Sequence, residues 1–387
     1  MNLDELKQGF QEIYGQEADA IYFAPGRVNL IGEHTDYNGG YVFPCALNFG
    51  TYLLVSRRKD PRDTRFITYN FQPSLILNDR LFTRKMLLTS WMKYPAGVMK
   101  EFRDAGHDPW GFNTLFYGNV PYGAGLSSSA SVEMVMAIML NDQLGAGLSP
   151  QDLALACQRA ENDYVGMKSG IMDQFVSAMG QKDHAILLDC KTLDFERVPL
   201  EMEGYSLVIA NTNKRRELAG SKYNERRAEC EEAARQINEA RPLQALCDLT
   251  PDEFERYAGL VTNETKRRRA RHAVTENARV KEAVAALKAG DSRRFGQLMN
   301  ESHRSLKEDY EVTGVELDTL AEEAQKLPGV LGSRMTGAGF GGCTVSLVET
   351  AAIPSFTGTL GETYKQRVGL TAEFYVAAIG DGASRVE

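Results

Sequence analysis

The sequence has few of the residues that mark a disulfide-stapled, zinc-binding or membrane-spanning protein. It has six cysteines in 387 residues, none in a C-x-x-C pair or near a histidine at zinc-ligand spacing. Scattered thiols in a chain of this length favour a reduced compartment over a disulfide framework. The most apolar helix-like run, Val132–Leu140, has nine residues, whereas a bilayer span needs about 20.

Positive charge is also in short supply. Lys and Arg number 44 against 52 Asp and Glu, a net charge of −8, which disfavours a general nucleic-acid binder. The one basic run, Lys266–His272, has no interleaved aromatics and is typical of a solvated helix face. Residues 1–7 lack the basic start and apolar run of a signal peptide. We therefore expect a soluble, cytoplasmic monomer that binds neither nucleic acid nor a membrane.

Hydrophobic spacing predicts mixed helices and strands. Ser149, with Pro150 and Asp152, forms a capping-box pattern that starts a helix running to about Tyr164. The irregular order of elements indicates an α+β fold, and an even division of the chain predicts domains 1–200 and 201–387. Further helices are expected near 1–14, 92–102, 127–140, 221–239 and 277–288, and strands near 51–56, 64–69, 112–120, 185–189 and 206–210.

A glycine- and serine-rich loop, Pro121–Ala130, runs into one predicted helix. Glycines allow close backbone approach, and the free N–H groups of a helix start suit a phosphate. The loop lacks the Gly-Lys-Ser/Thr of a Walker A motif. A phosphate site and a flexible turn with serine caps both fit this pattern. The candidate residues are Gly123, Ala124, Gly125, Leu126, Ser127, Ser128 and Ser129.

A second polar segment, residues 25–38, gathers Arg27, Glu33, His34 and Asp36 between glycines. Carboxylates and imidazole pair with sugar hydroxyls, and arginine pairs with phosphate. A solvated turn with local ion pairs is the plain alternative. A metal site on Glu33, His34 and Asp36 is another, although their spacing differs from that of a helical zinc motif.

Two more carboxylates stand out. Glu161 falls in line with apolar positions of the helix that starts at Ser149, so burial would require a partner, either magnesium or an arginine. Asp173 is expected in the first turn of a helix, where its plain role is to complement the dipole. Further along, the small residues of Met335–Cys343 indicate that a ligand or a neighbouring strand passes close to the backbone.

Taken in order, these segments resemble the GHMP family of small-molecule kinases, and within it the branch that phosphorylates galactose. The resemblance extends from residue 22 to residue 343. It departs from the usual family pattern at Ala338, where glycine is more common, and at Lys168-Ser169, where many members have Asn-Cys. The matching segments are Gly26–Asn38, Pro121–Ala130, Gly170–Gln174, Gly220–Arg227 and Met335–Cys343.

The resemblance implies a two-domain α+β fold with the active site in the cleft between the domains. The N-terminal domain would be ribosomal-protein-S5-like and the C-terminal domain ferredoxin-like. It also implies transfer of the ATP γ-phosphoryl group to the C1 hydroxyl of α-D-galactose with Mg²⁺, the first committed step of galactose metabolism.

The same resemblance implies a role for each site residue. Asp173 and its neighbour Arg27 would be catalytic. Asp173 would either remove the sugar O1 proton or only orient the hydroxyl while Arg27 stabilises charge, and the sequence leaves both open. The sugar would contact Glu33, His34, Thr35, Asp36, Gly170 and Tyr223, ATP would contact residues 123–129 and Trp91, and Mg²⁺ would be held by Ser129 and Glu161.

Two rival functions fit the same motifs. One is a kinase for a related sugar such as N-acetylgalactosamine, which needs more room near the sugar C2. The other is a non-catalytic regulator that binds galactose and ATP. The complete serine run before Ala130 favours an enzyme.

Overall fold

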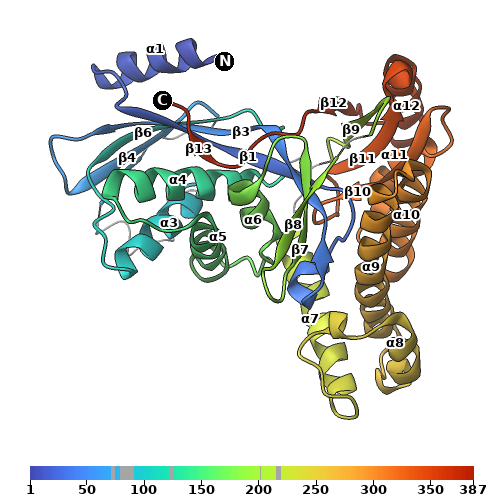
Figure 1. Cartoon of the computed structure of the whole chain (residues 1–387). Helices are drawn as coiled ribbons and strands as arrows, with labels where there is room; N and C mark the ends of the chain where they lie inside the picture. The colour runs from blue at the N-terminus through green and yellow to red at the C-terminus, as the bar shows by residue number, and fades with distance from the viewer. Residues whose placement is uncertain (71–74, 79–90, 122–124, 201, 215–218) are drawn as a thin grey trace.

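The N-terminal half is built on a six-stranded sheet with helices on both faces (Figure 1). The computed structural model describes all residues except 71–74, 79–90, 122–124, 201 and 215–218. The strand order is β13-β1-β3-β6-β4-β5, with β4 parallel to β6 and the other pairs antiparallel. The strands are β1 (Ala20–Asn29), β3 (Pro44–Arg57), β4 (Asp63–Thr68), β5 (Leu75–Asn78), β6 (Phe112–Gly118) and β13 (Ser384–Arg385).

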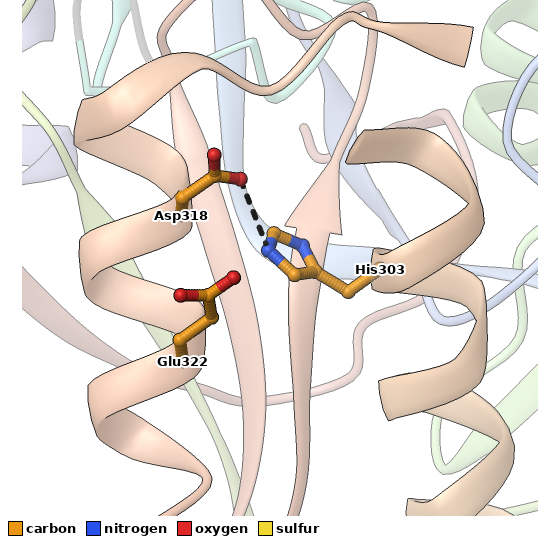
Figure 2. Close-up of side chains that lie close together, drawn as sticks. All are labelled: His303, Asp318 and Glu322. Carbon is orange, nitrogen blue, oxygen red and sulfur yellow. Dashed lines mark ion pairs between the residues drawn. The ribbon is translucent and has the colours of Figure 1, made fainter. Parts of the chain in front are cut away.

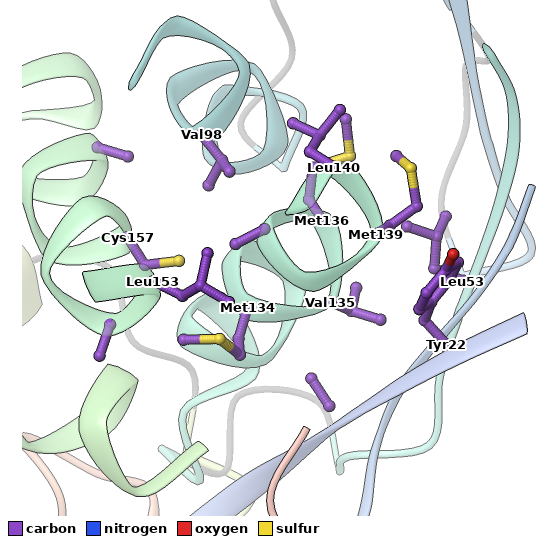
Figure 3. Close-up of a cluster of buried hydrophobic side chains, with 14 of the residues drawn as sticks. Tyr22, Leu53, Val98, Met134, Val135, Met136, Met139, Leu140, Leu153 and Cys157 are labelled. Carbon is purple, nitrogen blue, oxygen red and sulfur yellow. The ribbon is translucent and has the colours of Figure 1, made fainter. Parts of the chain in front are cut away.

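Helix α4 (Ser128–Leu144) is the centre of the N-terminal core (Figure 3). It is apolar around most of its circumference, so it packs on the sheet at Tyr22 and Leu53 and on the neighbouring helices at Val98 and Leu153. The second sheet face is covered by α1. The helices of this half are α1 (Leu3–Tyr14), α3 (Lys93–Asp104), α4, α5 (Pro150–Arg159) with a π turn over Ala160–Val165, and α6 (Met172–Met179).

The C-terminal half has a four-stranded antiparallel sheet, ordered β10-β11-β9-β12, with helices stacked beside it (Figure 1). A smaller sheet, β2-β7-β8, lies near the junction of the halves. Its strands are β2 (Tyr41–Val42), β7 (His184–Asp189) and β8 (Phe195–Pro199). The C-terminal elements are β9 (Tyr205–Asn211), α7 (Ala219–Asn238), α8 (Pro251–Tyr257), α9 (Glu264–Lys288), α10 (Ser292–Ser305), α11 (Gly314–Ala324), β10 (Val330–Thr336), β11 (Cys343–Glu349), α12 (Ile353–Val368) and β12 (Glu373–Ala377).

The two halves share one buried hydrophobic cluster. Val28 of β1 and Cys45 of β3 pack in it with Ile209 of β9 and Val345 of β11. The chain also returns at its end, because β13 pairs with β1. Lys7 Nζ and a Glu387 carboxylate oxygen lie 2.5 Å apart, which joins the two termini.

Most predicted elements are confirmed within a few residues, and so is the α+β class. Two are much longer than predicted: the helix expected near 277–288 is α9, which begins at Glu264, and the strand expected near 51–56 is β3, which begins at Pro44. The Ser149 capping box is present, with Ser149 and Asp152 satisfying each other's backbone N–H groups. All six cysteines lie among the described residues and none forms a disulfide, which agrees with the prediction of no disulfide framework. Across the described residues, none of the helices combines the length and the apolar character needed to cross a bilayer.

The interpretation of Lys266–His272 as a solvated helix face is wrong. The run lies on α9, and Arg269 and His272 are buried there. Arg269 pairs with Glu229 of α7 and with Glu311. The positive charge therefore faces carboxylates of neighbouring elements, because a buried guanidinium needs such partners.

Candidate active site

The candidate site residues meet in one cavity of about 530 Å³ at the junction of the two halves. Its walls come from β1, the loop after β1, the starts of α4 and α6, α7 and the loop between β10 and β11. The predicted residues that line it are Arg27, Glu33, His34, Asp36, Trp91, Gly125, Ser127, Ser128, Ser129, Glu161, Gly170, Asp173 and Tyr223. Gly123 and Ala124 lie outside the described residues.

Asp173 is held on both carboxylate oxygens. It occupies the first turn of α6, as predicted. Arg27 donates from Nε to Oδ1 at 2.8 Å, and its Nη2 lies 2.8 Å from the same oxygen. The Ser127 hydroxyl donates to Oδ2 at 2.5 Å. The dipole role alone is therefore insufficient, since a buried arginine and a serine fix this carboxylate toward the cavity.

Glu33 joins the loop after β1 to the C-terminal half. Its Oε1 accepts hydrogen bonds from the Gly337 N–H at 2.7 Å and from Arg334 Nη1 at 3.4 Å. The side chain is only 2% exposed. Burial raises the pKa of Glu33, and the charges of Arg334 and Arg27 oppose that shift. A solvated turn is thus excluded for this residue.

Asp36 lies against Gly170. A Cβ atom at Gly170 would come within 1.9 Å of Asp36 Oδ2, so only glycine leaves room for this carboxylate. Burial, followed by repulsion from Asp173 and Glu33, raises the pKa of Asp36 to about 7. Because like charges crowd around it, we expect the Asp36 side chain to be stabilised by a neutral hydrogen-bond donor in the cavity.

His34 and Thr35 have different surroundings. His34 lines the cavity and takes a left-handed conformation, φ 62°. Burial lowers its pKa well below the ordinary value, so the imidazole is neutral. Thr35 is fully buried outside the cavity lining, with its hydroxyl 2.9 Å from the Gly32 carbonyl and 2.7 Å from the Tyr41 carbonyl. It braces the turn that carries His34 and Asp36.

The described part of the serine-rich loop turns directly into α4. Ser127 has φ 58° and makes no side-chain cap, so the interpretation as a serine-capped turn is wrong. Leu126 is buried in the shared core and does not line the cavity. The Gly125 carbonyl accepts from Arg27 Nη1 at 2.8 Å. A Cβ at Gly337 would lie 2.7 Å from the Gly125 carbonyl oxygen. This close approach explains the small residues of the loop between β10 and β11.

Glu161 provides the test for a cation. It is 3% exposed and bonds only neutral groups among the described residues: Ser169 Oγ at 2.6 Å, Gln174 Nε2 at 2.7 Å and the Ser129 side chain. No arginine pairs with it in the described part of the chain, so the ion-pair alternative is wrong. Buried oxygen donors with uncompensated negative charge fit Mg²⁺.

Trp91 forms part of the cavity wall. Its ring packs on Phe66 and Phe116, with centroid distances of 6.3 and 5.6 Å. Its buried Nε1 has no hydrogen-bond partner among the described residues. An aromatic face with a free donor suits a planar heterocycle.

Several contributors were missed from the sequence. Glu133 of α4 is completely buried and accepts from Gln174 Nε2 at 3.1 Å, and Gln174 also bonds Glu161. A carboxylate inside the apolar run of α4 was a usable signal for this residue. Arg334 left no local signal, because its partners are far away in the sequence.

The fold and this cavity together define a small-molecule kinase of the GHMP class. The chain matches the GHMP kinases N terminal domain over residues 93–181, the GHMP kinases C terminal domain over 283–364 and the galactokinase galactose-binding signature over 8–57. Mevalonate kinase structures share the fold at 18% identity, with a TM-score of 0.64 for one of them.

The similarity to galactokinases extends over the full chain. The galactokinase of Fusobacterium nucleatum is 50% identical with all of both chains covered, and that of Enterococcus faecalis is 49% identical over 98% of this chain and 99% of its own. The structure of Lactococcus lactis galactokinase complexed with galactose superimposes with a TM-score of 0.95 at 44% identity, covering 99% of each chain. The chain belongs to the galactokinase family and is an ATP-dependent sugar kinase.

Proposed function

We propose that this cavity transfers the ATP γ-phosphoryl group to the C1 hydroxyl of α-D-galactose, giving galactose 1-phosphate and ADP. The observation that carries the proposal is the position of Asp173. Arg27 and Ser127 hold it in the cavity where the loop after β1 meets the serine-rich loop. The galactose complex of the Lactococcus lactis relative supports galactose as the sugar.

In this proposal Asp173 and Arg27 divide the chemistry. Asp173 accepts a hydrogen bond from the C1 hydroxyl and aims it at the γ-phosphorus. As the O1–P bond forms and the bond to ADP breaks, the hydroxyl proton passes to this carboxylate. Arg27 stabilises the charge that develops beside it. Arg27 and Ser127 already hold both carboxylate oxygens in place, so we assign orientation as its larger contribution.

The sugar is held by the loop after β1 and by α7. Asp36 and Tyr223 read the C3–C4 edge of galactose, since both line the cavity. Glu33 and His34 contact the remaining hydroxyls, and Gly170 provides the space beside Asp36. Thr35 supports the turn from behind.

ATP occupies the wall formed by Trp91 and the serine-rich loop. The phosphates lie against Gly125, Ser127, Ser128 and Ser129, with the N–H groups at the start of α4 as donors. Ser129 and Glu161 hold Mg²⁺, and the donor set described above supports this assignment. When bound, Mg²⁺ neutralises charge on the β- and γ-phosphate oxygens.

We also infer the setting of the enzyme. The chain divides into domains 1–200 and 201–387, with the β13 segment returning to the first. Six cysteines outside any disulfide favour the cytoplasm. We expect a monomer.

A coupled ADP-release assay over a panel of monosaccharides, with and without Mg²⁺, tests the proposed function. We expect ADP release with galactose and Mg²⁺, little with glucose, and little with N-acetylgalactosamine. Equal release with N-acetylgalactosamine would show a broader sugar kinase. Galactose binding without ADP release would show a non-catalytic regulator.

A further inference from the structure

A chain of buried hydrogen-bonding groups connects His34 to the C-terminal half. His34 Nδ1 lies 2.8 Å from the Tyr37 hydroxyl, and that hydroxyl lies 2.8 Å from the Tyr310 hydroxyl. The Tyr310 hydroxyl is 3.2 Å from Cys230 Sγ. Tyr37 lies in the turn Asp36–Asn38 of the loop after β1, Tyr310 ends the turn after α10, and Cys230 is on α7.

Ring packing fixes the imidazole at the start of this chain. The His34 ring contacts Tyr310 at 4.7 Å and Tyr223 at 5.6 Å between centroids. Tyr310 packs in turn on His272 at 4.5 Å, and its carbonyl accepts from Arg226 Nε at 2.8 Å. These contacts restrict rotation of the His34 and Tyr310 rings, so Nδ1 of His34 stays against Tyr37.

The neutral imidazole of His34 carries one proton. The hydrogen bonds along this series of groups decide which ring nitrogen holds it. A phenol O–H is a better donor than an imidazole N–H, and an imidazole nitrogen is a better acceptor than a phenol oxygen. At the far end, Cys230 keeps its proton and is both a weak donor and a weak acceptor. The strongest pairing in the chain is therefore Tyr37 O–H donating to His34 Nδ1.

We infer that Tyr37, backed by Tyr310 and Cys230, is a positioning residue that fixes His34 as the Nε2–H tautomer and thereby gives the sugar pocket an N–H donor. The inference rests on the proposed placement of the sugar beside His34. A hydroxyl that accepts from His34 is free to donate its own proton to a carboxylate. One side of the pocket then donates while Glu33 and Asp36 accept, which orients each sugar hydroxyl.

Imidazole ¹⁵N spectroscopy of the wild-type enzyme tests the tautomer without any variant. The chain has five histidines, and the His34 signals are assigned by their loss in His34→Gln. We expect an unprotonated Nδ1 and a protonated Nε2, both with and without galactose. A protonated Nδ1 at His34 would overturn the inference.

Tyr37→Phe tests the consequence for the sugar. Without the donor, His34 should populate both tautomers, and KM for galactose should rise roughly threefold to tenfold with kcat changed by less than about twofold. Tyr310→Phe should have a smaller effect, because Tyr37 still donates to His34.

Tyr364→Phe is the matched control. Its buried hydroxyl donates to the Thr212 carbonyl at 2.9 Å, away from the cavity. It should lower Tm and leave KM unchanged. If Tyr37→Phe does only the same and the His34 spectrum is unaltered, the positioning role is wrong. If His34→Gln leaves galactose KM unchanged, the sugar placement fails instead, and the wild-type spectrum still decides the tautomer.

Discussion

At the scale of single residues, the cavity concentrates carboxylates and gives each a different environment. Asp173 has an arginine and a serine, Glu161 has only neutral partners within the described part of the chain, and Asp36 has two carboxylates near it. The same functional group can therefore orient a hydroxyl, hold a cation or accept from a sugar, depending on what surrounds it.

Asp173→Asn should leave the fold intact and nearly abolish turnover. The amide keeps the size of the side chain, but one acceptor oxygen becomes an NH2 group, so the side chain loses a contact to Arg27 or Ser127 that orients the hydroxyl. It also cannot accept the hydroxyl proton, and such groups contribute about 10²–10⁴-fold to rate. The measurements are kcat in the ADP-release assay and Tm. Retention of more than about a tenth of wild-type kcat would exclude the proton-accepting role.

Glu161→Gln should raise the magnesium concentration needed for half-maximal rate more than it raises galactose KM. The reason is that the charge lost belongs to the proposed cation site. Mg²⁺ binding measured by calorimetry in the presence of ADP gives a second readout. Glu101→Gln is the control, because Glu101 pairs with Arg159 outside the cavity. An unchanged magnesium titration would count against the assignment.

Asp36→Asn should stabilise the fold more at pH 8 than at pH 5. With a folded-state pKa of about 7 against an ordinary value of 3.8, the folded chain binds more protons between these values. Stability therefore falls as pH rises through that range, and the neutral amide removes the loss. Tm at the two pH values is the measurement. Asp60→Asn is the control, since Arg62 lowers the pKa of Asp60 to about 2. Equal gains at both pH values would contradict the assignment.

At the scale of helices and strands, α10 and α11 are joined by His303, Asp318 and Glu322, which lie close enough to suggest a cation site (Figure 2). The Met335 N–H donates to His303 Nδ1 at 3.2 Å, so the neutral ring carries its proton on Nε2, which is 3.4 Å from Asp318 Oδ1. A protonated Nε2 cannot ligate a metal. Lys307 also lies against both carboxylates. The group is a structural tie between the helices and β10.

His303→Ala should destabilise the enzyme by about 1–3 kcal/mol, because the buried Met335 N–H loses its acceptor. Urea unfolding measures this loss. Addition of Zn²⁺ should not raise the Tm of the wild type. A Zn²⁺-dependent rise that disappears in His303→Ala would instead establish a metal site.

The elements that sequence predicted well carry their own signals. The helix at Ser149 has a local capping box, and strands such as β9 contain a short apolar run. Prediction failed where distant residues decide. The glycine-rich segment after Ala24 continues as strand β1 because β3 pairs with it. Arg269 in the basic run of α9 is buried, with Glu229 and Glu311 as its charged partners, while the neighbouring basic side chains stay partly exposed. The site motifs were found because they are short, whereas the Tyr37–Tyr310 contact joins residues from opposite halves.

At the scale of the whole molecule, a buried arginine connects the halves. Arg334 of β10 is fully buried and donates to the Asn29 carbonyl at 3.0 Å as well as to Glu33. Glu276 of α9 lies 4.0 Å from its Nη2. This network and the shared hydrophobic cluster indicate that the two halves unfold as one cooperative unit.

Arg334→Met should cost about 3–5 kcal/mol, because Glu33 would be left as an unpaired buried charge. Calorimetry should show one transition in the wild type. Arg294→Met is the matched control. Arg294 bonds Glu282 and Glu301 at the surface, where ion pairs contribute about 0–1 kcal/mol. Two separate wild-type transitions, or equal losses in both variants, would contradict the coupling.

The pairing of β13 with β1 also has a consequence for biosynthesis. The edge of β1 is among the first parts of the chain to leave the ribosome, but its partner strand lies at the far end of the sequence. Until translation reaches that strand, a nascent chain exposes unpaired backbone N–H and C=O groups along β1. Strands of neighbouring chains on the same polysome can pair with these groups. Chains that stop early keep this unpaired edge. We therefore expect truncated products to aggregate, and we expect the aggregation to appear before any loss of activity.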